Sequence, residues 1–223
     1  LWGSLNRELP FLAEAAPDEI FDIVERTLCL TPCPFEQLFA QEGKGIFGNN
    51  YLTGLLWALE SLAWDEEYLV RVCVVLGELA SRDPGGQWEN RPFNSLATIL
   101  LPWYPQTLAS VEKRKVAVET LYRENSNIGW KLILKLLPGQ LKTSSGSQKP
   151  VWREIIPDEW EEGVTIKEYQ QQVLTYAELA VVYVDLDTAR LTELINQFDS
   201  LPMPAFDQLI DVLSSPALDN LQE

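Results

Sequence analysis

The chain has 223 residues, of which 46% are hydrophobic and 22% are charged, and its formal net charge at pH 7 is -16. This length can supply one large core, and no apolar run approaches the roughly 18 to 20 residues that a membrane-spanning helix needs. The chain has no histidine, which excludes Ser-His and Cys-His nucleophilic sites. The negative charge argues against nucleic-acid binding by the chain as a whole.

Three cysteines, Cys29, Cys33 and Cys73, are too few for a disulfide framework and favour a reducing, cytoplasmic compartment. Cys29 and Cys33 have the spacing of half a metal site, but the chain lacks the other ligands that a zinc site needs. We therefore expect no metal and no other cofactor. No secretory signal is visible, and because the chain begins at Leu1, we expect a fragment of a longer protein.

The first helical pattern follows Pro17, which fits the first position of a helix, with Ile20, Phe21 and Val24 facing inward. The clearest pattern covers residues 50–81. Two apolar faces are visible there, one formed by Leu52, Leu55, Leu56, Leu59, Leu62 and Ala63 and the other by Leu69, Val72, Cys73, Leu76, Leu79 and Ala80. The short turn between them predicts an antiparallel pair.

Asp65 has the character of an N-cap for the second of these helices. Trp64 and Leu69 stand at the spacing of a hydrophobic staple around it. We therefore expect the second helix to begin directly after Asp65.

The same unit is expected to recur further along the chain. Residues 92–101 predict a helix that the Pro-rich stretch 102–105 ends, and Ser110 is expected to cap a helix through Tyr122. A short turn at 125–127 precedes an apolar helix face that ends at 138–139.

The remaining sequence changes character twice. The polar stretch 139–150 predicts a flexible loop, and residues 151–164 predict an irregular segment packed on the core. Thr165 is expected to cap a long helix over 166–183. Helical periodicity resumes at Leu191, and a last short helix is expected over 206–213.

These elements predict an all-α fold, because no stretch shows sustained period-two alternation. Helix pairs at roughly 40-residue spacing are typical of HEAT or armadillo stacking, in which antiparallel pairs form an α-solenoid. We predict that residues 1–223 form one α-helical, repeat-like domain. An irregular helical bundle is the alternative.

Several strings carry a family resemblance. They are Leu12-Ala13-Glu14-Ala15-Ala16-Pro17, Gly54-Leu55-Leu56-Trp57-Ala58-Leu59-Glu60, Leu76-Gly77-Glu78-Leu79-Ala80, Asn90-Arg91-Pro92, Leu100-Leu101-Pro102-Trp103-Tyr104-Pro105-Gln106-Thr107 and Gly129-Trp130-Lys131-Leu132. Over about residues 5–160 the chain resembles the HEAT-like helical region of very large bacterial proteins with a STAND-type NTPase module, some of which are similar to antiphage defence proteins. The resemblance implies a sensor or scaffold part outside the nucleotide-binding core. It transfers no catalytic residue.

A glycine-rich motif stands at residues 43–48, Gly43-Lys44-Gly45-Ile46-Phe47-Gly48. The spacing matches the G-x-G-x-x-G loop that binds phosphates at a helix N-terminus. The preceding residues, 35–39, have a helical rather than a strand pattern, and no Walker A motif is present. We interpret the motif as a loop between helices.

The basic residues concentrate in one region. Residues 110–153, the basic island, hold Lys113, Arg114, Lys115, Arg123, Lys131, Lys135, Lys142, Lys149 and Arg153 against three acidic residues. Lys131 and Lys135 are four apart and share a helix face. Such a surface could bind an acidic protein partner or a nucleic acid, and the alternative is that the island is neutralised within the chain or by other parts of a longer protein.

The candidate partner-binding residues are Lys113, Arg114, Lys115, Lys131, Lys135 and Arg153, together with the loop aromatics Trp88, Trp103 and Tyr104. We expect a non-enzymatic scaffold or sensor segment of a large cytoplasmic bacterial signalling or defence protein. Its expected partner is a protein or another domain of the same chain. A nucleic-acid-contacting domain that uses residues 110–153 is the alternative.

Overall fold

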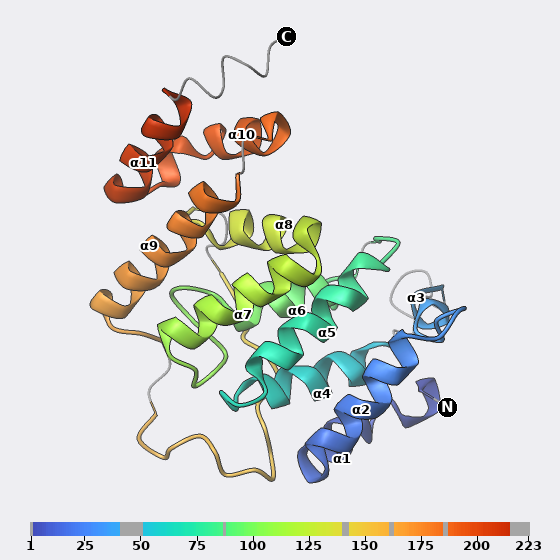
Figure 1. Ribbon diagram of the computed structural model, residues 1–223. Helices are drawn as coiled ribbons and strands as arrows, with labels where there is room; N and C mark the ends of the chain where they lie inside the picture. Colours follow the sequence, from blue (N-terminus) through green and yellow to red (C-terminus); the bar gives the residue numbers. More distant parts are fainter. Residues whose placement is uncertain are drawn as a thin grey trace.

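The computed structural model describes residues 2–40, 51–86, 88–139, 143–160, 163–184 and 187–214. Within these ranges the regular secondary structure consists of helices, with no strand, which confirms the all-α prediction for them (Figure 1). The α-helices are α1 (Leu9–Ala15), α2 (Pro17–Leu28), α3 (Glu36–Ala40), α4 (Thr53–Ala63), α5 (Leu69–Ser81), α6 (Pro92–Ile99), α7 (Val111–Glu124), α8 (Ser126–Leu136), α9 (Ile166–Tyr183), α10 (Thr188–Ile195) and α11 (Met203–Leu213), with short 3-10 turns at Gly3–Leu5 and Phe198–Ser200. No described helix has the length and apolar character needed to cross a membrane.

Local capping explains where several helices begin. The hydroxyl of Ser110 accepts a hydrogen bond from the amide of Lys113 at 3.2 Å, and Thr165 caps α9 in the same way. Both predicted caps are confirmed. The turn expected at 125–127 is shorter, because the side chain of Asn125 accepts from the amide of Ile128 and α8 begins directly after it.

Two predicted helix starts are wrong. Asp65 does not cap α5, which begins at Leu69. One oxygen of Asp65 instead accepts from the amide of Glu67, which holds residues 65–68 in a turn. The last helix begins at Met203 rather than at Phe206. Pro204 lies in its first turn, where a proline loses no intrahelical hydrogen bond.

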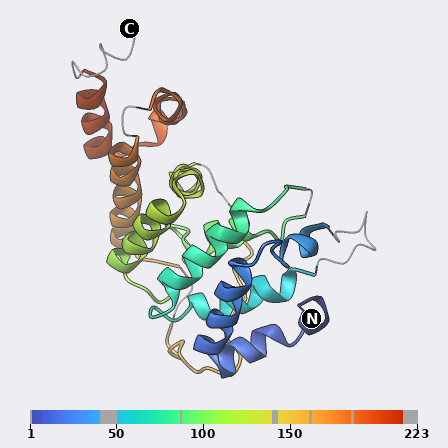
Figure 2. The same cartoon turned by 45° about the vertical axis from the view of Figure 1, so that its right-hand side comes forward.

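The helices contact one another in two neighbouring rows. One row runs from α1 to α4, α6 and α8, and the other from α2 to α5, α7 and α9, with contacts between rows at α4–α5, α5–α6, α7–α8 and α8–α9. The N-terminal helices and the α10–α11 pair lie at opposite ends in both views (Figures 1 and 2). Two rows are what stacked helix pairs would give, and the HEAT or armadillo identity of the pairs stays a prediction.

The core is continuous along both rows, from Leu9 to Leu209. Both predicted apolar faces of residues 50–81 are buried apart from Ala80, which is partly exposed. Polar contacts reinforce the rows at their surface. Arg71 on α5 meets three carboxylates of α2, Asp18 at 3.3 Å, Asp22 at 2.7 Å and Glu25 at 2.7 Å.

A glycine sets the close approach of α8 to α7. A Cβ atom at Gly129 would lie 2.5 Å from the Cα atom of Tyr122, which is backbone and cannot move aside independently. We expect Gly129→Ala to lower the free energy of unfolding by about 1–3 kcal/mol, as overpacking commonly does. Urea unfolding checks this, with the exposed α8 substitution Asn127→Ala as the control. Equal stability of the two variants would contradict the packing.

Candidate binding surfaces

Residues 143–153, which we call the strap, cross the helical body without regular secondary structure. Figure 1 shows the tan segment that contains the strap continuing along the lower edge of the molecule toward the start of α9. We expected residues 139–150 to form a flexible loop. Residues 140–142 lie outside the described residues, whereas 144 and 146–150 are partly buried. The amides of Ser147 and Gln148 donate hydrogen bonds to Gln106 and Glu60.

The end of the strap is bound by one carboxylate. Glu14 on α1 is only 6% exposed, and its oxygens accept hydrogen bonds from the amides of Val151 at 2.9 Å, Trp152 at 2.6 Å and Arg153 at 3.1 Å. A buried carboxylate is costly unless it is hydrogen-bonded. Three successive amides meet this requirement and fix the strap to α1.

The middle of the strap is bound by α4 and the loop after α6. Glu60 accepts from the amide of Gln148 at 2.9 Å, and the fully buried Gln106 accepts from the amide of Ser147 at 3.0 Å. In return, the carbonyl of Gln148 accepts from the indole N–H of Trp64 at 3.1 Å. The helical body therefore binds the main chain of the strap.

Burial raises the pKa of Glu60 above its ordinary value of 4.5, although hydrogen bonds from the hydroxyl of Ser95 and the amide of Gln148 lower it in part. The hydroxyl of Ser95 lies 2.5 Å from the carboxylate. Desolvation is the larger effect, so the charged form of Glu60 is disfavoured in the folded chain.

Most of the basic island is paired within the chain. Lys113 lies 3.4 Å from Glu66, and Lys115 lies 3.9 Å from Glu119. Arg153 lies 2.7 Å from Asp65, and both side chains are largely buried. Lys142 lies outside the described residues.

Arg114 is not on the surface, in contrast to our expectation. Its side chain is 1% exposed and forms an ion pair with Glu168 of α9. Arg114 stands at helical spacing from Ala117, Val118 and Leu121, which are all buried. That spacing was a usable sequence signal, and it places Arg114 in the α7–α9 contact instead of at a partner surface.

Lys131 and Lys135 differ from Lys113, Lys115 and Arg153. Both lie on α8, and neither forms an ion pair with any residue that the structure describes. Lys131 is exposed and Lys135 partly exposed.

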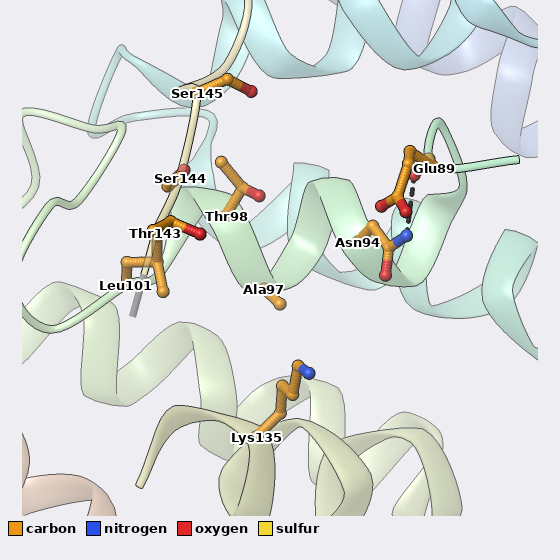
Figure 3. A pocket seen from close by; sticks show the side chains of 9 residues that line it. All are labelled: Glu89, Asn94, Ala97, Thr98, Leu101, Lys135, Thr143, Ser144 and Ser145. Carbon is orange, nitrogen blue, oxygen red and sulfur yellow. Dashed lines mark hydrogen bonds between the residues drawn. The ribbon is translucent and has the colours of Figure 1, made fainter. Parts of the chain in front are cut away.

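Lys135 borders a groove of about 520 Å³ between α6, α8 and the start of the strap. The lining is mainly polar: Glu89, Asn94, Ala97, Thr98, Leu101, Lys135, Thr143, Ser144 and Ser145. Figure 3 shows Lys135 projecting from α8 toward α6, with the hydroxyl residues gathered at one end and Glu89 with Asn94 at the other. The groove offers hydrogen-bond donors and one ammonium group to a polar ligand.

Two of the three loop aromatics contact each other. Trp103 and Tyr104 stack on each other with ring centroids 5.8 Å apart, and both are partly exposed. Trp88 is also partly exposed, in the segment between α5 and α6. Their role at an interface stays a prediction.

The glycine-rich motif and the three cysteines were the candidates for nucleotide and metal binding. The glycine-rich motif at 43–48 lies outside the described residues. Cys29 is exposed, whereas Cys33 and Cys73 are buried, and burial raises the pKa of the Cys73 thiol to about 12. Among the residues that the structure describes, no cluster of Cys, Asp or Glu side chains is arranged to hold a metal ion.

Comparison of the chain with protein-family models, with curated proteins and with solved structures finds no match.

The raised pKa of Glu60 predicts a pH dependence of stability. In the window that starts near pH 4.5 and ends at the raised folded-state pKa, the folded chain holds more protons at Glu60 than the unfolded chain does. The contribution of Glu60 to stability therefore falls as pH rises through this window. We expect the wild-type chain to lose stability relative to Glu60→Gln as the pH rises above 4.5, as measured by urea unfolding.

The control for this titration is Glu154→Gln, because Glu154 is an exposed carboxyl in the irregular segment directly after the strap. If Glu60→Gln and Glu154→Gln differ from the wild type by the same amount at every pH, the burial of Glu60 has no such effect.

Proposed function

We propose that this chain is a non-enzymatic scaffold segment that binds an acidic protein surface through Lys131, Lys135 and the adjoining groove. The observation that carries the proposal is that these two α8 lysines have no described ion-pair partner, although the chain carries a net charge of -16. Elsewhere in the island Lys113, Lys115 and Arg153 meet carboxylates of the same chain. Charge complementarity at such a patch steers an acidic partner to it.

A protein partner is favoured over a nucleic acid by the number of available cations. Affinity for nucleic acid rises with the number of phosphates that are neutralised. Arg114 is buried, and Lys113 and Arg153 already face carboxylates. The two α8 lysines of the basic island, on a chain of net charge -16, supply little of the phosphate contact that nucleic-acid binding requires.

The proposal assigns no catalytic activity to this segment. Hydroxyl groups line the groove together with Lys135 and Glu89, and the Ser-His and Cys-His arrangements of nucleophilic catalysis are excluded because the chain has no histidine. In this proposal the segment belongs to a large bacterial signalling or defence protein of the STAND type, in the cytoplasm. The resemblance of its sequence strings is the support for the family, and the three free cysteines support the compartment.

A charge-reversal experiment tests the proposal. The probe is a fluorescent deca-glutamate peptide, and the variant carries Lys131→Glu and Lys135→Glu. We expect its affinity to fall by about tenfold, because two surface ion pairs at ~0.7 kcal/mol each correspond to about that factor. Fluorescence anisotropy at low salt measures the change.

The matched control carries Lys115→Glu and Lys167→Glu, which changes the net charge equally at exposed positions away from the groove. We expect less than a twofold change for this control. Equal losses in the two variants would contradict specific binding at Lys131, Lys135 and the adjoining groove, which we call the α8 surface. Tighter and more salt-dependent binding of an oligo-dT probe than of the peptide would favour the nucleic-acid alternative.

A further inference from the structure

The site that holds the strap binds main-chain groups. We call Glu14, Glu60, Trp64 and Gln106 the channel, because their side chains accept from or donate to backbone atoms of residues 147–153. Each of these four side chains is less than 9% exposed and belongs to the helical body or its loops. A site that binds backbone groups accepts an extended chain largely independently of its side chains.

Two cations of the strap add selectivity. The ammonium of Lys149 lies 4.7 Å from the ring centroid of Trp160 and 5.5 Å from that of Trp64, a distance at which cation–π attraction operates. The guanidinium of Arg153 pairs with Asp65 and lies 5.3 Å from the ring centroid of Tyr68. The surroundings of the channel therefore favour positive charge at two positions four residues apart.

The large apolar side chains of the strap contribute little to its attachment. Val151 is 63% exposed and Trp152 is 72% exposed, and the indole makes an edge contact with the ring of Phe11, itself 48% exposed. Polar contacts and two cations therefore hold this part of the strap, with little apolar burial. Another chain that offers the same groups could replace those contacts without opening the hydrophobic core.

We propose that the channel is a recognition site for an extended, basic peptide segment of a partner protein, and that the strap is its intramolecular occupant. The partner segment carries two cations at the positions of Lys149 and Arg153, and it exchanges with the strap. A tethered occupant competes at an effective concentration in the millimolar range. The strap therefore sets a threshold that only a matching segment overcomes.

This inference is independent of the proposed function. The channel lies on α1, α4 and the loop after α6, and it selects positive charge, whereas the α8 surface selects an acidic partner. If the chain does not bind the deca-glutamate peptide, the proposed function fails but the inference about the channel does not.

The test uses the full chain with a weakened strap. The substitutions Lys149→Glu and Arg153→Glu remove the two cations but leave every channel residue intact. The probe is a fluorescent peptide that copies residues 143–154, and anisotropy compares the weakened chain with the wild type. We expect the weakened chain to bind the probe at least tenfold more tightly, because its own strap competes less. When Glu14→Gln is added to the weakened chain, the gain in the logarithm of the affinity for the probe should fall by at least half.

Two altered peptides test what the channel recognises. A peptide with Lys149→Glu and Arg153→Glu should bind at least tenfold more weakly than the copy. A peptide with Val151→Ala and Trp152→Ala should bind within threefold of it, because both side chains are exposed. Loss of binding by the second peptide would overturn the proposal, since recognition would then depend on the strap's own apolar side chains.

Two further results with the weakened chain would overturn the proposal. Failure of the weakened chain to bind the probe more tightly than the wild type overturns the proposal. If circular dichroism shows that the doubly substituted chain is unfolded, Lys149→Ala alone replaces it. If that milder variant is unfolded as well, the strap is an inseparable part of the fold and the proposal is overturned.

Discussion

The position of the strap on the helical body depends on the carboxylate of Glu14. Its side chain is buried between α1 and the strap, where an unbonded charge would be strongly unfavourable. Three successive amides of residues 151–153 provide the required donors. The strap must therefore lie across α1, and Glu60 and Gln106 extend the same mode of binding toward α4 and the loop after α6.

Charge is distributed unevenly over the molecule. Most described cations of the basic island form ion pairs within the chain, and Arg114 pairs with Glu168 inside the contact between α7 and α9. Lys131 and Lys135 are left beside a polar groove, while acidic and aromatic side chains surround the strap. We accordingly propose partners of opposite charge for these two surfaces.

Short-range patterns made the helices predictable. Ser110 and Thr165 cap helices through atoms three residues away, and the apolar faces of α4 and α5 follow helical spacing. The strap could not be predicted in the same way, because Glu14 meets residues that are more than 130 positions later in the chain. Asp65 was misread as a cap for a related reason, since its carboxylate serves a local turn and the distant Arg153. Polar residues of the strap resemble a loop in composition, and only tertiary contacts reveal that the segment is anchored.

Amide hydrogen exchange tests most directly whether the Glu14 carboxylate holds the strap. The account predicts that Glu14→Gln accelerates exchange at Val151, Trp152 and Arg153 by about ten- to a hundredfold, because a hydrogen bond to a charged group contributes about 1.5–3 kcal/mol. Amides in the middle of α5 should exchange as in the wild type. Unchanged exchange at the three strap amides, or uniform acceleration throughout the chain, would contradict the account.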